Sequence, residues 1–198
     1  MLADGALAFD EPSHTYTLHG KRVPGVTEVL DTIRMLDGVP PEVLAAAGEF
    51  GTHVHQACHL HNMDDLDWDS LDPRLALYVR GYRKFVADTG FKVIHSERRV
   101  ASARYSYAGT LDLYGELRSA TTVIDLKSTA SLPLYVGPQC AAYQQALQDT
   151  TGEKSRRRYC LHLKPEDYRL IELKNPQDFN DFVSCLNVYR MRQRSRIA

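Results

Sequence analysis

The segment VIDLKST, at residues 123–129, places two opposite charges two residues apart in what reads as a buried strand. Because side chains alternate across a strand, Asp125 and Lys127 lie on one face, and Ile124 and Leu126 lie on the other. Charged side chains are rarely buried unless they are paired or perform a function. The segment therefore predicts either a salt bridge within a sheet or part of a polar site.

A second strand, TLDLYGEL, precedes this segment and carries Asp112 on its polar face. The turn between the two strands falls at residues 118–119 or 119–120. The first turn sets Asp112 opposite Asp125, and the second sets it opposite Lys127. Directly opposed residues point to the same side of a sheet, so both registers predict that these three side chains share one face.

Carboxylates on opposed positions lie about 5 Å apart and repel each other unless a cation lies between them. A hard divalent cation, Mg²⁺ or Mn²⁺, removes this repulsion and takes phosphate as a further oxygen ligand. A neighbouring lysine can orient water or stabilise developing negative charge. A plain cross-strand salt bridge between Asp125 and Lys127 is the alternative, and the additional Asp112 favours a site.

Composition limits the classes of protein to consider. The chain has 198 residues, 43% hydrophobic content and a net charge of −1, so we expect one domain in which any DNA contact comes from local basic patches. No apolar run is long enough to span a membrane, and no secretory signal opens the sequence. The four cysteines form no CxxC pair, so we expect reduced thiols in a cytoplasmic protein and no iron–sulfur cluster.

Helical and strand patterns follow one another in an order typical of an α/β or α+β domain with one central sheet. We expect an N-terminal β-hairpin and helices in residues 1–90, a core in 91–173 and a C-terminal helix in 174–198. The signals are, in order, strands at 14–18 and 21–23, a helix from Thr27, a longer helix opened by Pro40-Pro41-Glu42 and running toward His61, a helix from Pro73 ended by Gly90, strands from Phe91 to Lys127, a helix from Pro138 that ends just before Gly152, two strands around Pro165, and a helix after Asn175.

Five motifs in this order resemble the PD-(D/E)xK nuclease superfamily, in particular its RecB-type and lambda-exonuclease branch. Asp112 followed by Asp125-Leu126-Lys127 is similar to the central motif, and GTLD before it is similar to the G-x-x-D that often opens it. QCAAY at 139–143 resembles the Q-x-x-x-Y element. Glu97 resembles the glutamate of the first core strand, and GTHVH at 51–55 resembles the G-x-x-x-H helix. The proline often found before the first aspartate is absent.

The resemblance covers roughly residues 14–173 and implies a restriction-endonuclease-like αβββαβ core with a central mixed sheet flanked by helices. It implies that His55, Asp112, Asp125 and the Leu126 carbonyl hold one or two Mg²⁺ or Mn²⁺ ions. Glu97 would join them directly or through water, and Lys127 would position the attacking water. His53, His59 and His61 are alternatives to His55.

Gln139 and Tyr143 lie one helical turn apart and share a face, from which they would steady the lysine, the water or a phosphate. Tyr143 could equally be a core aromatic. Cations and aromatic residues just before the site strand suit phosphate contact and base stacking. These DNA-binding candidates are Arg98, Arg99, Arg104, Tyr105 and Tyr107, with Arg156–Arg158 and Arg190, Arg192, Arg194 and Arg196 as further clusters.

The implied function is a metal-dependent exonuclease that hydrolyses DNA ends, single- or double-stranded, in phage-type recombination, repair or replication. A single-strand annealing or binding protein is an expected partner. Two alternatives remain open, a structure-specific or site-specific endonuclease and an inactive DNA-binding module.

Overall fold

Five strands from the second half of the chain form one mixed sheet in the computed structural model, which describes residues 2, 5–33 and 41–195. The elements are β1 (Leu7–Asp10), β2 (Thr15–Leu18), β3 (Lys21–Val23), α1 (Val26–Leu30), the 3₁₀ turn η1 (Asp31–Ile33), α2 (Pro41–Asn62), α3 (Pro73–Thr89), β4 (Lys92–Ser102), β5 (Tyr107–Leu117), β6 (Ala120–Lys127), α4 (Val136–Thr151), β7 (Arg157–Lys164), β8 (Asp167–Glu172) and α5 (Asp178–Ser195).

The strand order in the main sheet is β4-β5-β6-β7-β8. β4, β5 and β6 form an antiparallel meander, β6 and β7 are parallel, and β8 returns antiparallel to β7. The parallel pair requires a crossover, which α4 provides. The run from α3 to β7 is therefore αβββαβ, and the predicted mixed α/β architecture is confirmed.

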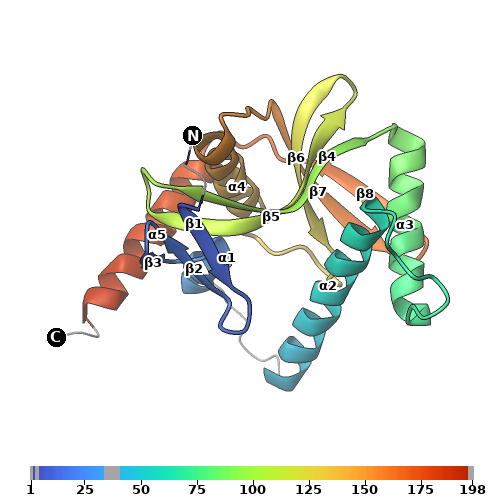
Figure 1. Ribbon diagram of the computed structural model, residues 1–198, viewed down its shortest axis with the longest axis horizontal. Coiled ribbons are helices and arrows are strands. Elements are labelled where there is room, and N and C mark those ends of the chain that lie inside the picture. The colour runs from blue at the N-terminus through green and yellow to red at the C-terminus, as the bar shows by residue number, and fades with distance from the viewer. Residues whose placement is uncertain (1, 3–4, 34–40, 196–198) are drawn as a thin grey trace.

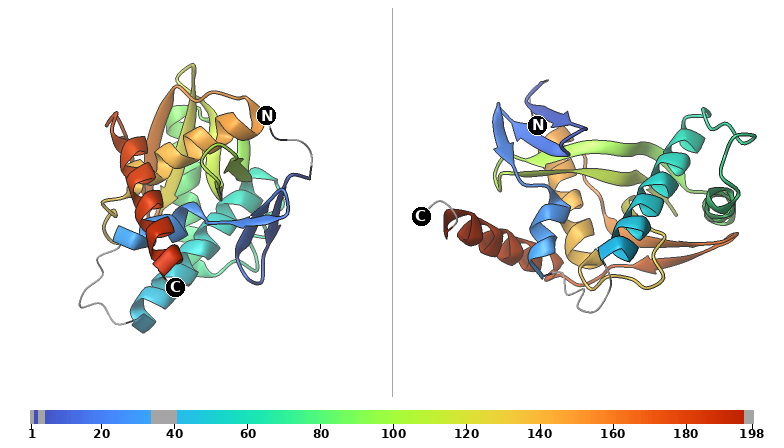
Figure 2. Two further views of the ribbon diagram at one scale, coloured as in Figure 1. Left: turned by 90° about the vertical axis from the view of Figure 1, so that its left-hand side faces the viewer. Right: turned by 90° about the horizontal axis from the view of Figure 1, so that it is seen from below.

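Helices cover both faces of this sheet (Figures 1 and 2). On one face, α3 and the second half of α2 enclose a core that includes Val54, Phe85 and Leu126. On the other face, α4 packs on the sheet with α1 and α5 around it, and this core includes Leu147 and Phe182. Burying each such side chain contributes about 1.5–3 kcal/mol, so the two cores fix the sheet between them.

The N-terminal region forms a three-stranded sheet rather than the predicted hairpin alone. β2 and β3 pair around His19-Gly20, as predicted, and both turn residues have positive φ. β1 adds a third strand that pairs antiparallel with β2. This sheet has its own small core of Tyr16, Leu18 and Val23, which alternate with exposed or half-buried positions.

The predicted helix ends agree best where a cap is present. Asp72 caps α3 by accepting a hydrogen bond from the Arg74 backbone N–H at 2.7 Å, and Gly90 ends the helix in the left-handed region. α4 begins two residues before the predicted Pro138. α5 begins at Asp178, after a turn in which the Asn175 side chain accepts from the Gln177 backbone N–H. The end of the predicted helix after Thr27, from residue 34, lies outside the described residues.

A two-residue turn at Arg118 and Ser119 joins β5 to β6. Both residues have positive φ, 49° and 60°, as a tight hairpin turn of the type I′ class requires. Leu117 pairs with Ala120, and Leu113 pairs with Ile124. Of the two possible registers, the structure has the first.

The helices within the described residues include none with the length and apolar character to cross a membrane.

Two helical glycines give a matched test of this packing. A Cβ atom at Gly81 in α3 would lie 2.5 Å from the Asp167 carbonyl oxygen and 2.7 Å from that of Lys164, whereas one at Gly48 in α2 would meet no atom within 4 Å. We expect Gly81→Ala to lower the free energy of unfolding by about 1–3 kcal/mol. Gly48→Ala should raise it by about 0.5–1 kcal/mol because alanine favours helix. Urea titration followed by circular dichroism measures both, and equal effects would contradict the close packing of α3 on the β7–β8 turn.

Candidate active site

The β5–β6 hairpin brings two aspartates to one place. Continuing the register beyond Leu113 and Ile124 sets Asp112 directly opposite Asp125. Asp125 is 1% exposed and Asp112 is 7% exposed. The Lys127 ammonium lies 2.7 Å from Asp125 Oδ2, and its side chain is only 13% exposed. The three residues predicted to share a face therefore do so, in a region closed to bulk water.

Glu97 reaches the same place from the neighbouring strand β4. On either side of Glu97, Ser96 pairs with Leu113 and Arg98 pairs with Leu111. Glu97 therefore lies opposite Asp112. Its φ is +48°, which is unusual for a residue that is not glycine within a strand. Such a conformation costs on the order of 1–3 kcal/mol and is concentrated at functional sites. The unusual backbone conformation is therefore found at Glu97 itself, the residue whose carboxylate reaches the site.

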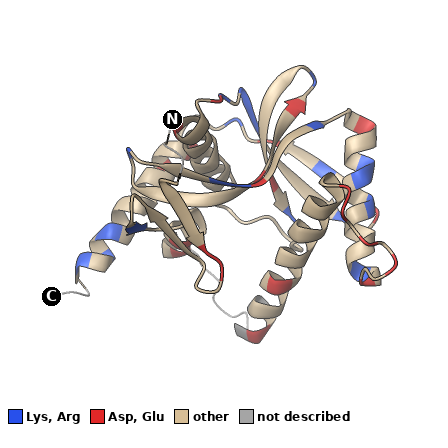
Figure 3. Ribbon diagram, in the orientation of Figure 1, with Lys and Arg blue, Asp and Glu red and all other residues tan. Residues whose placement is uncertain are grey.

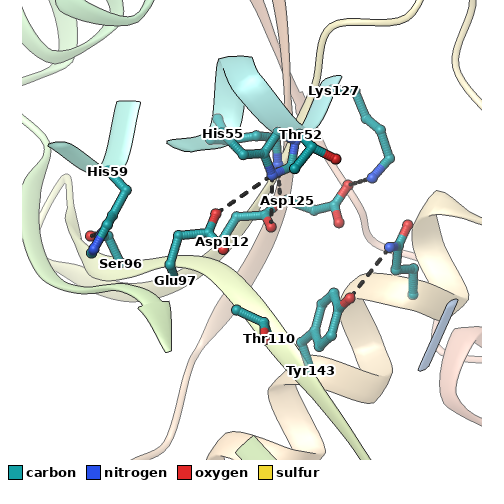
Figure 4. A network of polar contacts seen from close by, with 12 residues as sticks. Thr52, His55, His59, Ser96, Glu97, Thr110, Asp112, Asp125, Lys127 and Tyr143 are labelled. Carbon is teal, nitrogen blue, oxygen red and sulfur yellow. Dashed lines mark hydrogen bonds and ion pairs between the residues drawn. The ribbon is translucent and has the colours of Figure 1, made fainter. Parts of the chain in front are cut away.

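His55 approaches from α2 (Figure 4). Its Nδ1 lies 3.2 Å from Asp112 Oδ1 and 3.6 Å from Glu97 Oε1. Ligand atoms of these three residues all lie within 4.8 Å of one another, an arrangement that can hold a metal ion. The second oxygen of Asp112 accepts a hydrogen bond from the Leu126 backbone N–H at 2.6 Å, which fixes the carboxylate.

Several buried oxygens at this site have no hydrogen-bond partner within the described part of the chain. They are Glu97 Oε1, both carboxylate oxygens of Asp125 and Gln139 Oε1. Asp125 Oδ2 forms an ion pair with Lys127 at 2.7 Å, and Glu97 Oε1 lies 3.6 Å from His55 Nδ1, so Asp125 Oδ1 and Gln139 Oε1 are the two that have neither kind of partner among the described residues. Buried polar atoms are almost always paired, so these oxygens need an explanation. The donor set of imidazole and carboxylates fits a divalent cation.

The charges at the site shift the ionisation of its members. Burial opposes the charged imidazole, but the carboxylates of Asp112 and Glu97 raise the pKa of His55 to about 10. Burial alone would raise the pKa of Asp112, yet the neighbouring His55 holds it below its usual value. Burial raises the pKa of Asp125 to about 6, Lys127 offsets part of this, and Asp112 adds to it. Burial likewise raises the pKa of Glu97.

α4 places the predicted amide and phenol beside these groups. Gln139 Nε2 lies 3.5 Å from the Tyr143 hydroxyl, and both side chains are buried. The Tyr143 ring rests against Gly109, where a Cβ atom would come within 2.7 Å of its Cε1. The glycine of the GTLD segment therefore makes room for the ring of Tyr143.

The other histidines of α2 lie elsewhere. His53 is exposed, and His59 Nδ1 lies 2.5 Å from the Ser96 hydroxyl. His61 packs edge-on to Tyr82. None of these three is in the group of ligand atoms that the described residues form around Asp112.

The DNA-binding candidates divide into exposed and buried residues. Arg99 lies over the Phe9 ring at 4.8 Å, and Arg104 lies over the Tyr105 ring at 5.2 Å; both guanidinium groups are on exposed residues. Arg98 is half-buried, with Nη1 3.4 Å from His95 Nδ1. Tyr105 packs against Phe179.

The prediction for Tyr107 is wrong. Its side chain is fully buried, its hydroxyl donates to the Ala142 carbonyl oxygen at 2.8 Å, and its ring packs on Phe182. A DNA base has no access to it. Of the basic tail, Arg196 lies outside the described residues.

The sequence reasoning missed His162. It pairs with Lys127 across the parallel β6–β7 ladder and is 6% exposed, and its Nε2 lies 2.6 Å from the Thr129 carbonyl oxygen. This contact fixes the chain just after Lys127. The alternation in RRYCLHL carried the signal, because it puts Cys160 and His162 on one face, but the parallel pairing was needed to align them with Asp125 and Lys127.

No protein-family model matches the sequence, and no curated protein sequence matches it. Among solved structures, the chain is similar to the alkaline exonuclease LHK-Exo from Laribacter hongkongensis, with 11% identity, a TM-score of 0.43 and coverage of 87% of this chain and 88% of that one. The structure of LHK-Exo in complex with dAMP is 10% identical in sequence and has a TM-score of 0.45. That alignment covers 88% of this chain and 89% of LHK-Exo. The structure of SSO0001 gives 15% identity and a TM-score of 0.38, and the alignment spans 59% of this chain and just over half, 57%, of SSO0001.

The raised pKa of Glu97 leads to a pH-dependent prediction for the metal-free protein. Because the folded-state pKa lies above the ordinary value, ionising Glu97 costs stability as the pH rises through that pKa. Glu97→Gln should therefore melt higher than the wild type at pH 8, by a few degrees, and the difference should shrink toward pH 4.

Thermal melts with and without Mn²⁺ measure this effect. The wild type should gain stability from the metal, and Glu97→Gln should gain much less. Glu49→Gln, an exposed site on α2, is the control. A variant that melts lower than the wild type at pH 8 without metal would show that Glu97 serves mainly as a partner of His55.

Proposed function

We propose that this chain is a divalent-metal-dependent deoxyribonuclease of the PD-(D/E)xK superfamily, in its RecB-type and lambda-exonuclease branch, and that residues 1–198 form one nuclease domain. The observation that carries the proposal is the convergence of Glu97, Asp112 and Asp125 beside His55 and Lys127, with two buried oxygens, Asp125 Oδ1 and Gln139 Oε1, that have no partner among the described residues. A structural salt bridge would need neither the third carboxylate nor the strained backbone of Glu97.

His55, Glu97, Asp112 and Asp125 are the residues that would hold Mg²⁺ or Mn²⁺, together with the Leu126 carbonyl. The ion would supply positive charge to a phosphate group and lower the pKa of water, which is what phosphodiester hydrolysis needs. The protein's own part is to keep these oxygens in place through the Leu126 N–H and the hairpin register.

Lys127 would act as a fixed cation. Burial opposes its charge, but Asp125 and Asp112 raise the pKa of Lys127 above its usual value, so it stays protonated at neutral pH. A protonated lysine cannot accept a proton, and its role is to orient water and to stabilise negative charge on the phosphate. Gln139 and Tyr143 would hold the phosphate or the water from the α4 side.

The depth of the site favours a flexible strand over the side of an intact duplex, because a carboxylate with 1–7% exposure is reached only by a narrow group. This depth supports an exonuclease acting on ends. The resemblance of the sequence motifs is the only basis for proposing that it works in the cytoplasm, in recombination, repair or replication, with a single-strand annealing or binding protein as a partner. Arg98 and Arg99, next to Glu97 on β4, are the proposed contacts to DNA near the site, and Arg104 and Tyr105 are proposed to contact DNA further along, in the β4–β5 turn.

End-labelled linear DNA, covalently closed circular DNA and single-stranded DNA, each incubated with Mg²⁺ and then Mn²⁺, test this function. We expect metal-dependent release of nucleotides from linear DNA and no attack on closed circles, with all cleavage lost in Asp112→Asn. Cleavage of circles would identify an endonuclease. DNA binding with no cleavage under either metal would identify an inactive binding module.

The role of Lys127 can be separated from its ion pair with Asp125. Because the pair is buried, Lys127→Met should lower stability, by about 3–5 kcal/mol if Asp125 stays ionised. It should also lower the single-turnover rate at saturating metal by about 100-fold or more, measured well below the melting temperature. Lys127→Arg retains the charge but not the position of the donor and should restore stability more than rate. Normal cleavage by a destabilised Lys127→Met would leave only the structural role.

A further inference from the structure

Three segments that lie far apart in the sequence carry positive charge without any negative charge. Residues 20–24, 98–107 and 187–195 contain eight Lys or Arg and no Asp or Glu, although the whole chain has a net charge of −1. Residues 62–72 show the reverse, with five Asp and no Lys or Arg. Charge is therefore segregated between segments of the sequence.

The structure joins these three segments. Arg190 on α5 donates a hydrogen bond to the Tyr105 carbonyl oxygen in the β4–β5 turn. Arg22 on β3 and Tyr189 on α5 both bond to Glu28 Oε1, at 3.2 Å and 2.6 Å. Figure 3 shows the Lys and Arg of β3, of the β4–β5 turn and of the second half of α5 on one side of the molecule. The acidic segment after α2 lies on the opposite side.

We propose that Lys21, Arg22, Arg104, Arg190, Arg192 and Arg194 form a basic face that binds the phosphate backbone of DNA away from the site of cleavage. The inference rests on the proposed function, because it places the rest of a DNA substrate whose scissile phosphate is at Asp112. Lys21, Arg104, Arg192 and Arg194 are exposed. Arg104 is held over the Tyr105 ring, so it presents its charge with reduced freedom.

β4 connects the site to this face. The part of β4 from Glu97 to its end at Ser102 is about 17 Å long at 3.3 Å per residue. One strand of B-DNA advances about 3.4 Å per nucleotide, so the basic face meets phosphates on the order of five nucleotides from the scissile bond. Arg99, over the Phe9 ring, lies on β4 between the two. DNA that ends within this distance of the scissile bond does not reach the basic face.

A second explanation exists for Arg192 and Arg194, because cations in the last turn of a helix are favoured by its dipole. That role would affect the melting temperature and leave DNA binding unchanged. Lys21 and Arg104 are not on α5, and the dipole gives no reason for them.

The test combines Lys21→Gln, Arg192→Gln and Arg194→Gln in one variant. The matched control combines Arg80→Gln, Arg83→Gln and Lys84→Gln, three exposed cations on α3. Affinity for a long duplex is measured without metal by fluorescence anisotropy at several salt concentrations. Melting temperatures of both variants verify folding.

We expect the basic-face variant to bind long DNA at least about tenfold more weakly at 0.1 M salt, with the slope of log K against log [salt] reduced by about two to three. The control should bind as the wild type does. Cleavage of an oligonucleotide of about four nucleotides should be the same in the wild type and in the basic-face variant, because that substrate does not reach the face.

Unchanged affinity and slope in the basic-face variant would overturn the inference, as would equal weakening in the control. Because affinity is measured without metal, this result does not depend on cleavage. A wild type that binds DNA through the basic face and cleaves nothing would contradict the proposed nuclease while leaving the surface in place.

Discussion

Mutual repulsion among Glu97, Asp112 and Asp125 is the constraint on which the rest of this structure depends. Three carboxylates from three neighbouring strands meet where water is largely excluded, and burial raises the pKa of two of them. His55 and Lys127 supply opposing charge from α2 and β6. Replacing these buried charged side chains with apolar residues of similar volume would often leave a protein equally stable or more stable. Their presence is therefore not explained by stability alone. A bound metal ion could offset the repulsion that remains, since ligand atoms of His55, Glu97 and Asp112 lie within 4.8 Å of one another.

Packed helices and strands surround the carboxylates and hold them in place. α4, which crosses between the parallel strands β6 and β7, is buried along most of its first three turns and holds Gln139 beside Tyr143, whose hydroxyl is close enough to Asp112 and Asp125 to feel their charge. Gly109 lets the Tyr143 ring approach the sheet. The N-terminal sheet is tied to the same strand, because the Tyr16 hydroxyl lies 2.9 Å from Thr110 Oγ1. Movement of the site would thus require several packed layers to move together.

The sequence predicted the β5–β6 hairpin and its shared polar face because the two candidate registers differ by two residues. A shift of two residues keeps each side chain on the same face of the sheet. It also predicted the ends of α3, where Asp72 and Gly90 act locally. The left-handed backbone of Glu97 could not be foreseen, because nothing in HSERRV departs from an ordinary strand. Tyr107 was assigned to DNA for its aromatic character, and its burial depends on Phe182 of a distant helix. His162 was missed because its neighbour Lys127 is adjacent only through long-range parallel pairing.

The turn at Arg118 and Ser119 has a consequence for how such a sequence can change over generations. A slip of one residue between paired strands turns every side chain to the other face. A single codon gained or lost in this turn would exchange Asp125 and Lys127 for Leu126 and its apolar neighbours. Selection can therefore accept new residues here, above all asparagine or glycine, which adopt positive φ readily. The length of the turn, in contrast, should be inherited without change for as long as the carboxylates are used.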